Sequence, residues 1–432
     1  MEIITDFLQH FTPVFTRPAQ KIFNRLVTGF VQTPYPEALT DLNIERPESE
    51  PYARVYEFLR RYAWSYERLA QCLTDWFLKH LWSGERLLLA VDDTKVQKPH
   101  ARKMSGLSWH AEHHQLVKTT GKSSTGEEVE TTGVTGERGH NWVVLGALFR
   151  SGSTWDCLPL KAGLFVREKD CKDSLFEPKW KIALALRNSL KLSVQPLLVG
   201  DNYYSSADMV NALNGKVLSR LKCTAVGYEE PELSPEKKRG RPKKYGAKLK
   251  LKAVLEACPK QRQVEVFVYG ELKKATLSER IVRLKNHNKP VRVLLVQGLT
   301  QEGMMLFTND LELSPEQMMT YYSARFQIEM NFRELKGSMG AFNYRVRSRQ
   351  SIHNYLHIAF VAYALQKYIS VSGAIKPRTT AWYKPTGDAS PLHVQRALSQ
   401  RFQDLRIFEG LQKKQLLQKN IDLDEFMRVV AA

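Results

Sequence analysis

Two short apolar runs that are each followed by an aspartate constrain the fold of this chain most. Residues 86–91 are long enough for a buried strand and end at Asp92 and Asp93, and residues 194–200 end at Asp201. Open α/β sheets place ligands and chemistry at the carboxyl ends of their strands. The two runs therefore predict two strands that deliver carboxylates to one edge of a sheet.

The residues around these runs predict how the rest of that sheet is built. Residues 141–149 and 154–165 are strand-like and flank a turn, which is typical of a hairpin. Residues 180–192 have helical periodicity, and a short helix at 206–213 and a strand at 216–221 follow Asp201. The order strand, hairpin, helix, strand, helix, strand predicts an α/β fold with a mixed sheet and helices on both faces.

Residues 314–336 predict one helix of about six turns. A capping serine, a proline at the first helical position and a capping-box glutamine open it, and the next glycine or proline is Gly337. One face of this helix carries a tyrosine, two cations and a carboxylate, namely Tyr322, Arg325, Lys336 and Glu329. The Arg325–Glu329 spacing is also that of an ordinary i,i+4 ion pair, so the helix alone leaves a surface and a functional site equally open.

The charge of the chain indicates a polyanionic partner. Lysine and arginine outnumber aspartate and glutamate by 64 to 45, a net charge of +19, and nucleic acid is the usual partner of such a protein. Eight of these cations lie in residues 237–250, among them Arg239, Arg241, Lys243 and Lys244. Arg-Gly-Arg-Pro at 239–242 resembles an AT-hook, which reads a narrow minor groove. The alternative is a solvated basic loop that contacts phosphates without reading bases.

Several other classes of protein are disfavoured. The five cysteines are scattered without C-x-x-C spacing, which argues against a disulfide framework or a cysteine zinc site. The histidines at 110, 113 and 114 lack a zinc-binding motif and are interpreted as surface or core residues. The N-terminus does not resemble a signal peptide, and polar residues interrupt the apolar run 352–371, so we expect a buried helix and a cytoplasmic protein.

The leading chemical hypothesis joins Asp93, Asp201 and Glu329 in one site. Three carboxylates in one pocket repel one another unless a cation neutralises them, and Mg²⁺ prefers such oxygen ligands. Two such ions can activate an attacking oxygen and stabilise a leaving one in phosphodiester chemistry. Arg325 and Lys336 would then bind flanking phosphates.

At full spacing, Tyr322-x2-Arg325-x3-Glu329-x6-Lys336 resembles the Tyr-Arg-Glu-Lys signature of the DDE transposases of bacterial insertion sequences. The aspartate–threonine pair at 93–94 and the segment 199–205 resemble the two aspartate sites of that family. The resemblance implies an RNase H-like core, two Mg²⁺ ions for which Mn²⁺ can substitute, cleavage at transposon ends, and strand transfer by the freed 3′-hydroxyl. It also implies double-stranded DNA partners (terminal inverted repeats and target), a homodimer on DNA, and a nucleoid-associated bacterial protein.

The expected domain organisation is a catalytic core with an insertion and two helical ends. Residues 1–85 are a helical region that is a candidate for DNA binding, 86–222 the first part of the core, 223–312 a β-rich insertion with the basic loop, 313–345 the glutamate-bearing helix, and 346–432 a helical C-terminal region.

Three questions stay open at this level. Asp92 competes with Asp93 as the first ligand, since strand alternation sends the two to opposite sides, and Asp93 is chosen because the aspartate of the family precedes a threonine. No tryptophan lies between Asp201 and Glu329, where some relatives use one to hold a flipped base, so a DNA hairpin intermediate is in question. A retired DNA-binding protein, or a nuclease without strand transfer, is the alternative function.

Overall fold

The computed structural model describes residues 2–42, 44, 51–122, 128–171, 176–213, 215–231, 243–258, 261–268, 271–379, 382 and 387–413. The chain divides into two compact units. One, here called the helical unit, comprises Met1–Leu81, Ser151–Thr154 and Asn331–Ala432. The other, the sheet unit, comprises Trp82–Arg150 and Trp155–Met330 and contains the first and second aspartate sites together with Glu329.

Five strands form the core of the sheet unit in the order β4-β3-β1-β5-β6. They are β1 (Leu88–Gln97), β3 (Glu128–Ser151), β4 (Thr154–Phe165), β5 (Leu197–Gly200) and β6 (Lys216–Leu221). β1 runs antiparallel to β3 and parallel to β5, which in turn runs parallel to β6. This mixed sheet agrees with the α/β fold that the sequence predicted.

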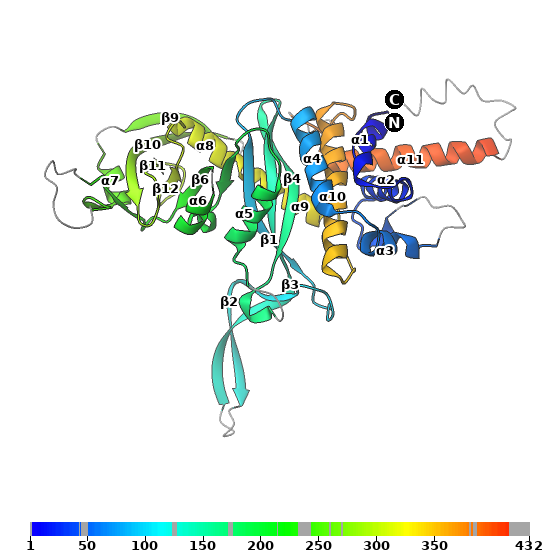
Figure 1. Ribbon diagram of the computed structural model, residues 1–432, viewed down its shortest axis with the longest axis horizontal. Coiled ribbons are helices and arrows are strands. Elements are labelled where there is room, and N and C mark those ends of the chain that lie inside the picture. The colour runs from blue at the N-terminus through cyan, green and yellow to red at the C-terminus, as the bar shows by residue number, and fades with distance from the viewer. Residues whose placement is uncertain are drawn as a thin grey trace. The chain divides into compact units, whose positions relative to one another are not determined.

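The first strand is longer than its hydrophobicity suggested. The apolar run stops at Val91, but β1 continues to Gln97 because β3 pairs with it throughout, as far as Gln97↔Gly139. Asp92 and Asp93 therefore lie inside β1, whereas the sequence placed them at its end. The polar stretch after Lys95 also forms strands, since β2 (Ser108–Lys122) pairs with β3 in a long hairpin that projects from the sheet (Figure 1).

The insertion extends this sheet on the far side of β6. Its elements are β7 (Val226–Tyr228), β8 (Lys248–Lys250), α7 (Leu251–Glu256), β9 (Arg262–Val268), β10 (Glu271–Leu284), β11 (Val291–Gln297) and β12 (Met304–Thr308). β12 pairs antiparallel with β6, so the β-rich insertion and the core share one 12-stranded sheet.

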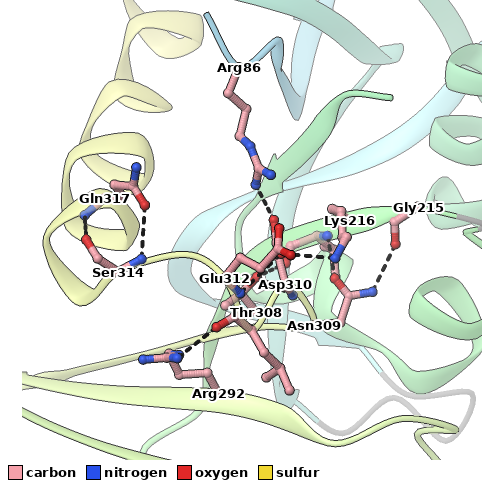
Figure 2. Close-up of polar contacts among 12 residues, drawn as sticks. Arg86, Gly215, Lys216, Arg292, Thr308, Asn309, Asp310, Glu312, Ser314 and Gln317 are labelled. Carbon is pink, nitrogen blue, oxygen red and sulfur yellow. Dashed lines mark hydrogen bonds and ion pairs between the residues drawn. The ribbon is translucent and has the colours of Figure 1, made fainter. Parts of the chain in front are cut away.

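A buried aspartate fixes the point where the chain leaves the sheet for the next helix. Asp310, just after β12, is fully buried, accepts from Lys216 Nζ at 3.0 Å, and also pairs with Arg86 (Figure 2). Asn309 beside it accepts from the Val217 backbone N at 2.8 Å. Burial alone would raise the pKa of Asp310, but the hydrogen bonds from its two cationic partners outweigh burial and lower it. The start of β1, β6 and the end of β12 are thereby joined at one carboxylate.

The predicted helix at 314–336 is present and is divided at one residue. α8 (Pro315–Ala324) begins with the predicted capping box, in which Ser314 Oγ accepts from Gln317 N at 3.2 Å and Gln317 Oε1 accepts from Ser314 N at 3.0 Å (Figure 2). α9 (Phe326–Lys336) follows after Arg325, whose φ of −52° and ψ of −33° remain helical. Arg325 therefore lies at a joint between two short helices that keep almost the same course.

Three shorter elements cover the core strands. α5 (Lys179–Ser189) packs closely on β4, because a Cβ on Gly163 would lie 2.5 Å from Ile182 Cγ2. The turn η4 (Asn202–Ser205) follows β5 directly, and α6 (Ala207–Ala212) follows η4.

The helical unit is organised around α10 (Arg349–Val371), which is buried over nearly its whole length. The other helices of this unit are α1 (Glu2–Gln9), α2 (Arg17–Gln32), α3 (Ala53–Arg60), α4 (Tyr66–His80) and α11 (Pro391–Lys413). Ser65 caps α4, accepting from Glu67 N at 3.1 Å. In the described ranges, no helix combines the length and the apolar character that crossing a membrane requires.

Candidate active site

The register of the two central parallel strands brings Asp92 and Asp201 level with each other. Val91 pairs with Gly200 in the last step of the β1–β5 ladder, and the two aspartates are the next residues on each strand. Level residues on neighbouring parallel strands present their side chains to the same face. Asp92 and Asp201 are therefore neighbours on one side of the sheet.

Arg325 connects this pair to the helix that carries Glu329. Its Nη1 lies 2.6 Å from Asp92 Oδ2 and its Nη2 lies 2.8 Å from Glu329 Oε1. The Arg325 and Asp92 side chains are 12% and 15% exposed, so their ion pair is largely shielded from water, whereas the Glu329 side chain is 42% exposed. One guanidinium thus lies between Asp92, the alternative to Asp93 as the first carboxylate, and Glu329.

The environment of Asp92 opposes its charge. Burial raises the pKa of Asp92 from 3.8 to about 6, against the opposing attraction of Arg325, and the carboxylates of Asp201 and Asp93 add to the rise. Arg325 responds in the opposite sense. Burial alone would lower its pKa, but Asp92 and Glu329 outweigh burial and raise it. The carboxylates around Asp92 thus carry more negative charge than the single guanidinium of Arg325 can neutralise.

Asp93 faces the other side of the strand and has a different cation. Its Oδ2 lies 2.6 Å from Nζ of Lys179, the first residue of α5, and both side chains are mostly buried. Consecutive strand residues alternate faces, which explains why Asp93 meets α5 while Asp92 meets Arg325.

The second aspartate is held by its own backbone surroundings. Asp201 Oδ1 caps η4 by accepting from Tyr203 N at 2.9 Å, and its carbonyl accepts from Ser219 Oγ of β6 at 2.5 Å. Tyr204 is fully buried beneath this turn, and burial raises its pKa well above 10, with the three aspartates adding to the rise. The turn after β5 is therefore fixed in place, which gives the Asp201 carboxylate a defined position.

The remaining sequence-predicted residues lie in varied surroundings. Tyr322 is buried, and its ring centroid lies 5.7 Å from Cζ of Arg325, so the ring packs against the guanidinium. Lys336 is exposed at the end of α9 and belongs to the helical unit. Lys243 and Lys244 are exposed, whereas Arg239 and Arg241 lie outside the described residues. A DNA contact by each of these six residues stays a prediction.

Two residues with clear roles in this region carry no recognisable sequence signal. Lys179 neutralises Asp93, yet in the sequence it is one lysine among many at the start of a helix. Asp310 organises the exit from β12, yet it follows an ordinary strand end. Only the long-range contacts of the fold identify either residue.

The carboxylates are not arranged as a preformed metal cage. Within the described ranges, no group of three or more histidine, cysteine, aspartate or glutamate side chains is placed to hold a metal ion. The donor chemistry nevertheless fits a divalent cation, because hard oxygen donors converge where burial and like charge oppose further negative charge. Arg325 supplies positive charge between Asp92 and Glu329 in this arrangement.

Comparison with known proteins assigns the family. No curated protein matches the chain. Among solved structures, the chain is similar to piggyBac transposase in a synaptic complex with hairpin DNA, at a TM-score of 0.35 and 10% identity over 80% of this chain. The similarity spans 56% of that chain, which is less than two thirds of its length.

The family model of the DDE superfamily endonucleases matches residues 10–280. The match includes β1 and β5 with their aspartates and ends before Glu329. Because it covers more than half of the sequence, the chain belongs to the DDE superfamily endonuclease family.

Proposed function

We propose that this protein is a DNA transposase that cuts DNA at the ends of a mobile element and joins the freed 3′-hydroxyl to target DNA. The observation that carries the proposal is the Asp92–Arg325–Glu329 bridge beside Asp201. It links residues more than two hundred positions apart at the carboxyl end of the central parallel strand pair, where such folds place their chemistry.

The proposed metal ligands are one aspartate of β1, Asp201 and Glu329. The sequence favoured Asp93 for the first position, and that choice stays a prediction. Two observations support Asp92 in its place: it is level with Asp201, and it shares Arg325 with Glu329. Asp93 is neutralised by Lys179 on the opposite face.

Divalent ions held by these residues, Mg²⁺ or in its place Mn²⁺, would supply charge stabilisation and an activated oxygen for phosphodiester cleavage and transfer. The side chains of the chain itself perform the positioning. Ser219 and the capped turn η4 fix Asp201, and the buried Tyr322 supports Arg325. With divalent ions held at Asp92 and Glu329, the Arg325 guanidinium would be available to bind a DNA phosphate in a bidentate manner.

The proposed partner is double-stranded DNA, at both the element ends and the target. The net charge of +19 supports this partner, and the exposed Lys243, Lys244 and Lys336 are proposed phosphate contacts. DNA binding is also proposed for Arg239 and Arg241 and, through its contact with Arg325, for the buried Tyr322. We further propose a homodimer on DNA, because two ends must be brought together.

The test is cleavage of a plasmid that carries the DNA flanking the gene, with and without Mg²⁺. Wild type should nick this plasmid only with the metal, and Glu329→Gln should abolish nicking while retaining DNA binding in a gel-shift assay. Glu316→Gln is the matched control, because Glu316 is a similarly exposed glutamate on α8 whose partner is Arg262. Full nicking by the Glu329→Gln protein would overturn the assignment.

Product analysis in the same assay decides between the related functions. Joined molecules would support strand transfer, and cuts without joining would indicate a nuclease of the same family. DNA binding with no cleavage by wild type under any divalent metal would indicate a DNA-binding protein that has lost catalysis.

A further inference from the structure

A strip of aromatic rings and cations runs beside the candidate site on the Asp93 side of the sheet. It consists of Tyr203, Lys179, Phe165, Arg167 and Trp109 and is here called the stacking strip. These residues come from four places in the sequence: η4, the start of α5, the end of β4 with the residues after it, and β2. None of them has a role in the function proposed above except Lys179, as the partner of Asp93.

Tyr203 is the most exposed ring of the strip and is firmly anchored. Its side chain is 44% exposed, although it lies only two residues after Asp201. Its backbone N donates to the Asp201 carboxylate, and its ring packs edge-on against the buried Tyr204 at 5.4 Å between centroids. Burial raises the pKa of Tyr203, and the nearby Asp93 and Asp201 add to that rise. The ring is thus an exposed flat surface held next to two of the candidate carboxylates.

Lys179 lies between Tyr203 and the next ring of the strip. Its Nζ is 5.4 Å from the ring centroid of Tyr203 and 5.4 Å from that of Phe165, and its ion pair with Asp93 fixes it there. A cation over an aromatic face is attracted by the ring electrons, which orders both groups. The lysine therefore holds the two rings in a defined arrangement.

The strip continues with a second cation–aromatic pair. The Arg167 guanidinium lies 5.2 Å from the Trp109 ring centroid, and Asp170 fixes this pair by accepting from Arg167 Nε at 3.0 Å and from Trp109 N at 3.3 Å. The pKa of His110, which is next to Trp109, is affected by burial and by the nearby cations. Its pKa is lowered by burial first, and then by Lys95, Arg167 and Lys179. Two cations of the strip, Arg167 and Lys179, therefore both lie near enough to His110 to lower its pKa.

We propose that the stacking strip binds an unpaired segment of DNA, with a base stacked on Tyr203. Alternating rings and cations suit a single strand, whose bases expose flat faces and whose phosphates need positive charge. Bases inside a duplex have no free face to offer, so the strip distinguishes unpaired from paired DNA. The proposal rests on the proposed function for DNA as the partner, while its binding test does not require cleavage.

The test compares two DNA probes in EDTA, so that no cutting occurs. One probe is a short blunt duplex and the other is the same duplex with an unpaired extension that contains 2-aminopurine, whose fluorescence falls when it stacks. Wild type should bind the extended probe more tightly and quench its fluorescence. Tyr203→Leu should lose about tenfold in affinity for the extended probe, since it removes the ring on which a base stacks, and should bind the blunt duplex as wild type does.

One further variant makes the result specific. Tyr203→Trp keeps a stacking ring and should retain the quenching. Equal binding of the two probes by wild type, or unchanged quenching in Tyr203→Leu, would overturn the proposal. Separate measurement of plasmid nicking shows whether the proposed function itself has failed, because the strip can bind DNA in a protein that does not cut.

Discussion

Replacing Asp92 by asparagine should stabilise the metal-free protein at neutral pH while it abolishes cleavage. Asp92 has a side chain that is only 15% exposed, and burial raises its pKa from 3.8 to about 6. A buried group whose pKa is raised in the folded state destabilises the fold when it is ionised. Asparagine has nearly the same shape without the charge.

The magnitude follows from the difference between the two pKa values. A shift of about two units corresponds to about 3 kcal/mol, since one unit is worth about 1.4 kcal/mol. The sign follows from proton linkage. Between about pH 4 and pH 6 the folded protein holds a proton that the unfolded chain has released, so stability falls as pH rises through this window. Above pH 6 the full penalty of about 3 kcal/mol is present, and Asp92→Asn removes it.

The assay is urea unfolding in EDTA at pH 5 and at pH 8 for wild type and Asp92→Asn. The variant should be more stable than wild type at pH 8, and the difference should shrink at pH 5. Asp93→Asn is the matched control and should have the opposite sign, because it removes the partner of Lys179 at 2.6 Å, an interaction worth roughly 1.5–3 kcal/mol. Saturating Mg²⁺ should then stabilise wild type but not Asp92→Asn, by about 2.7 kcal/mol at a hundred times the Kd.

Two results would refute this reasoning. If Asp92→Asn were less stable than wild type at pH 8, the Arg325 ion pair would outweigh the burial penalty of Asp92. If Mg²⁺ stabilised Asp92→Asn as it does wild type but failed to stabilise Asp93→Asn, Asp93 would be the first metal ligand, as the sequence suggested.

Three further predictions concern single contacts. Asp310→Asn should destabilise the protein by about 3 kcal/mol in urea unfolding, because it breaks a buried ion pair with two cations. The pKa of Asp310 is lowered in the folded protein, so the stability that this carboxylate contributes should be present above about pH 4 and be lost as the pH falls further. Gly340→Ala should lower the Tm of the protein, because φ at this residue is +55° and a Cβ would lie 2.2 Å from the Pro36 carbonyl oxygen. Arg325→Gln should move the pH dependence of Asp92 upward in the unfolding assay, since Arg325 is the group that lowers its pKa.

The sequence was informative wherever a local signal decides the structure. Ser314 and Gln317 predicted the start of α8 because a capping box satisfies backbone groups within one turn. The short apolar runs predicted β1 and β5, because a strand buried on both faces must be apolar throughout. Such signals need no knowledge of distant residues.

The sequence could not decide what depends on pairing between distant segments. The length of β1 beyond Val91 is set by β3, which pairs with polar residues that show no strand signal of their own. The choice between Asp92 and Asp93 depends on which face of β1 the helix with Glu329 covers, and that follows from the β1–β5 register and from the return of the chain after Asp310. A one-residue difference in register would exchange the two aspartates without changing any local signal.

The i,i+4 spacing of Arg325 and Glu329 left a surface ion pair and a functional site equally open, and the structure shows that the ion pair belongs to the candidate site. Asp92 is buried and its ionised form opposes folding, so a cation must neutralise it in the metal-free protein. Arg325 does so from a joint between two helices, with its guanidinium 2.6 Å from Asp92 and 2.8 Å from Glu329. A lysine at this position would present one ammonium instead of a planar fork and would bridge the two carboxylates less well. The metal-free fold therefore needs an arginine at position 325 to bridge the two carboxylates, in addition to any phosphate that this arginine later binds.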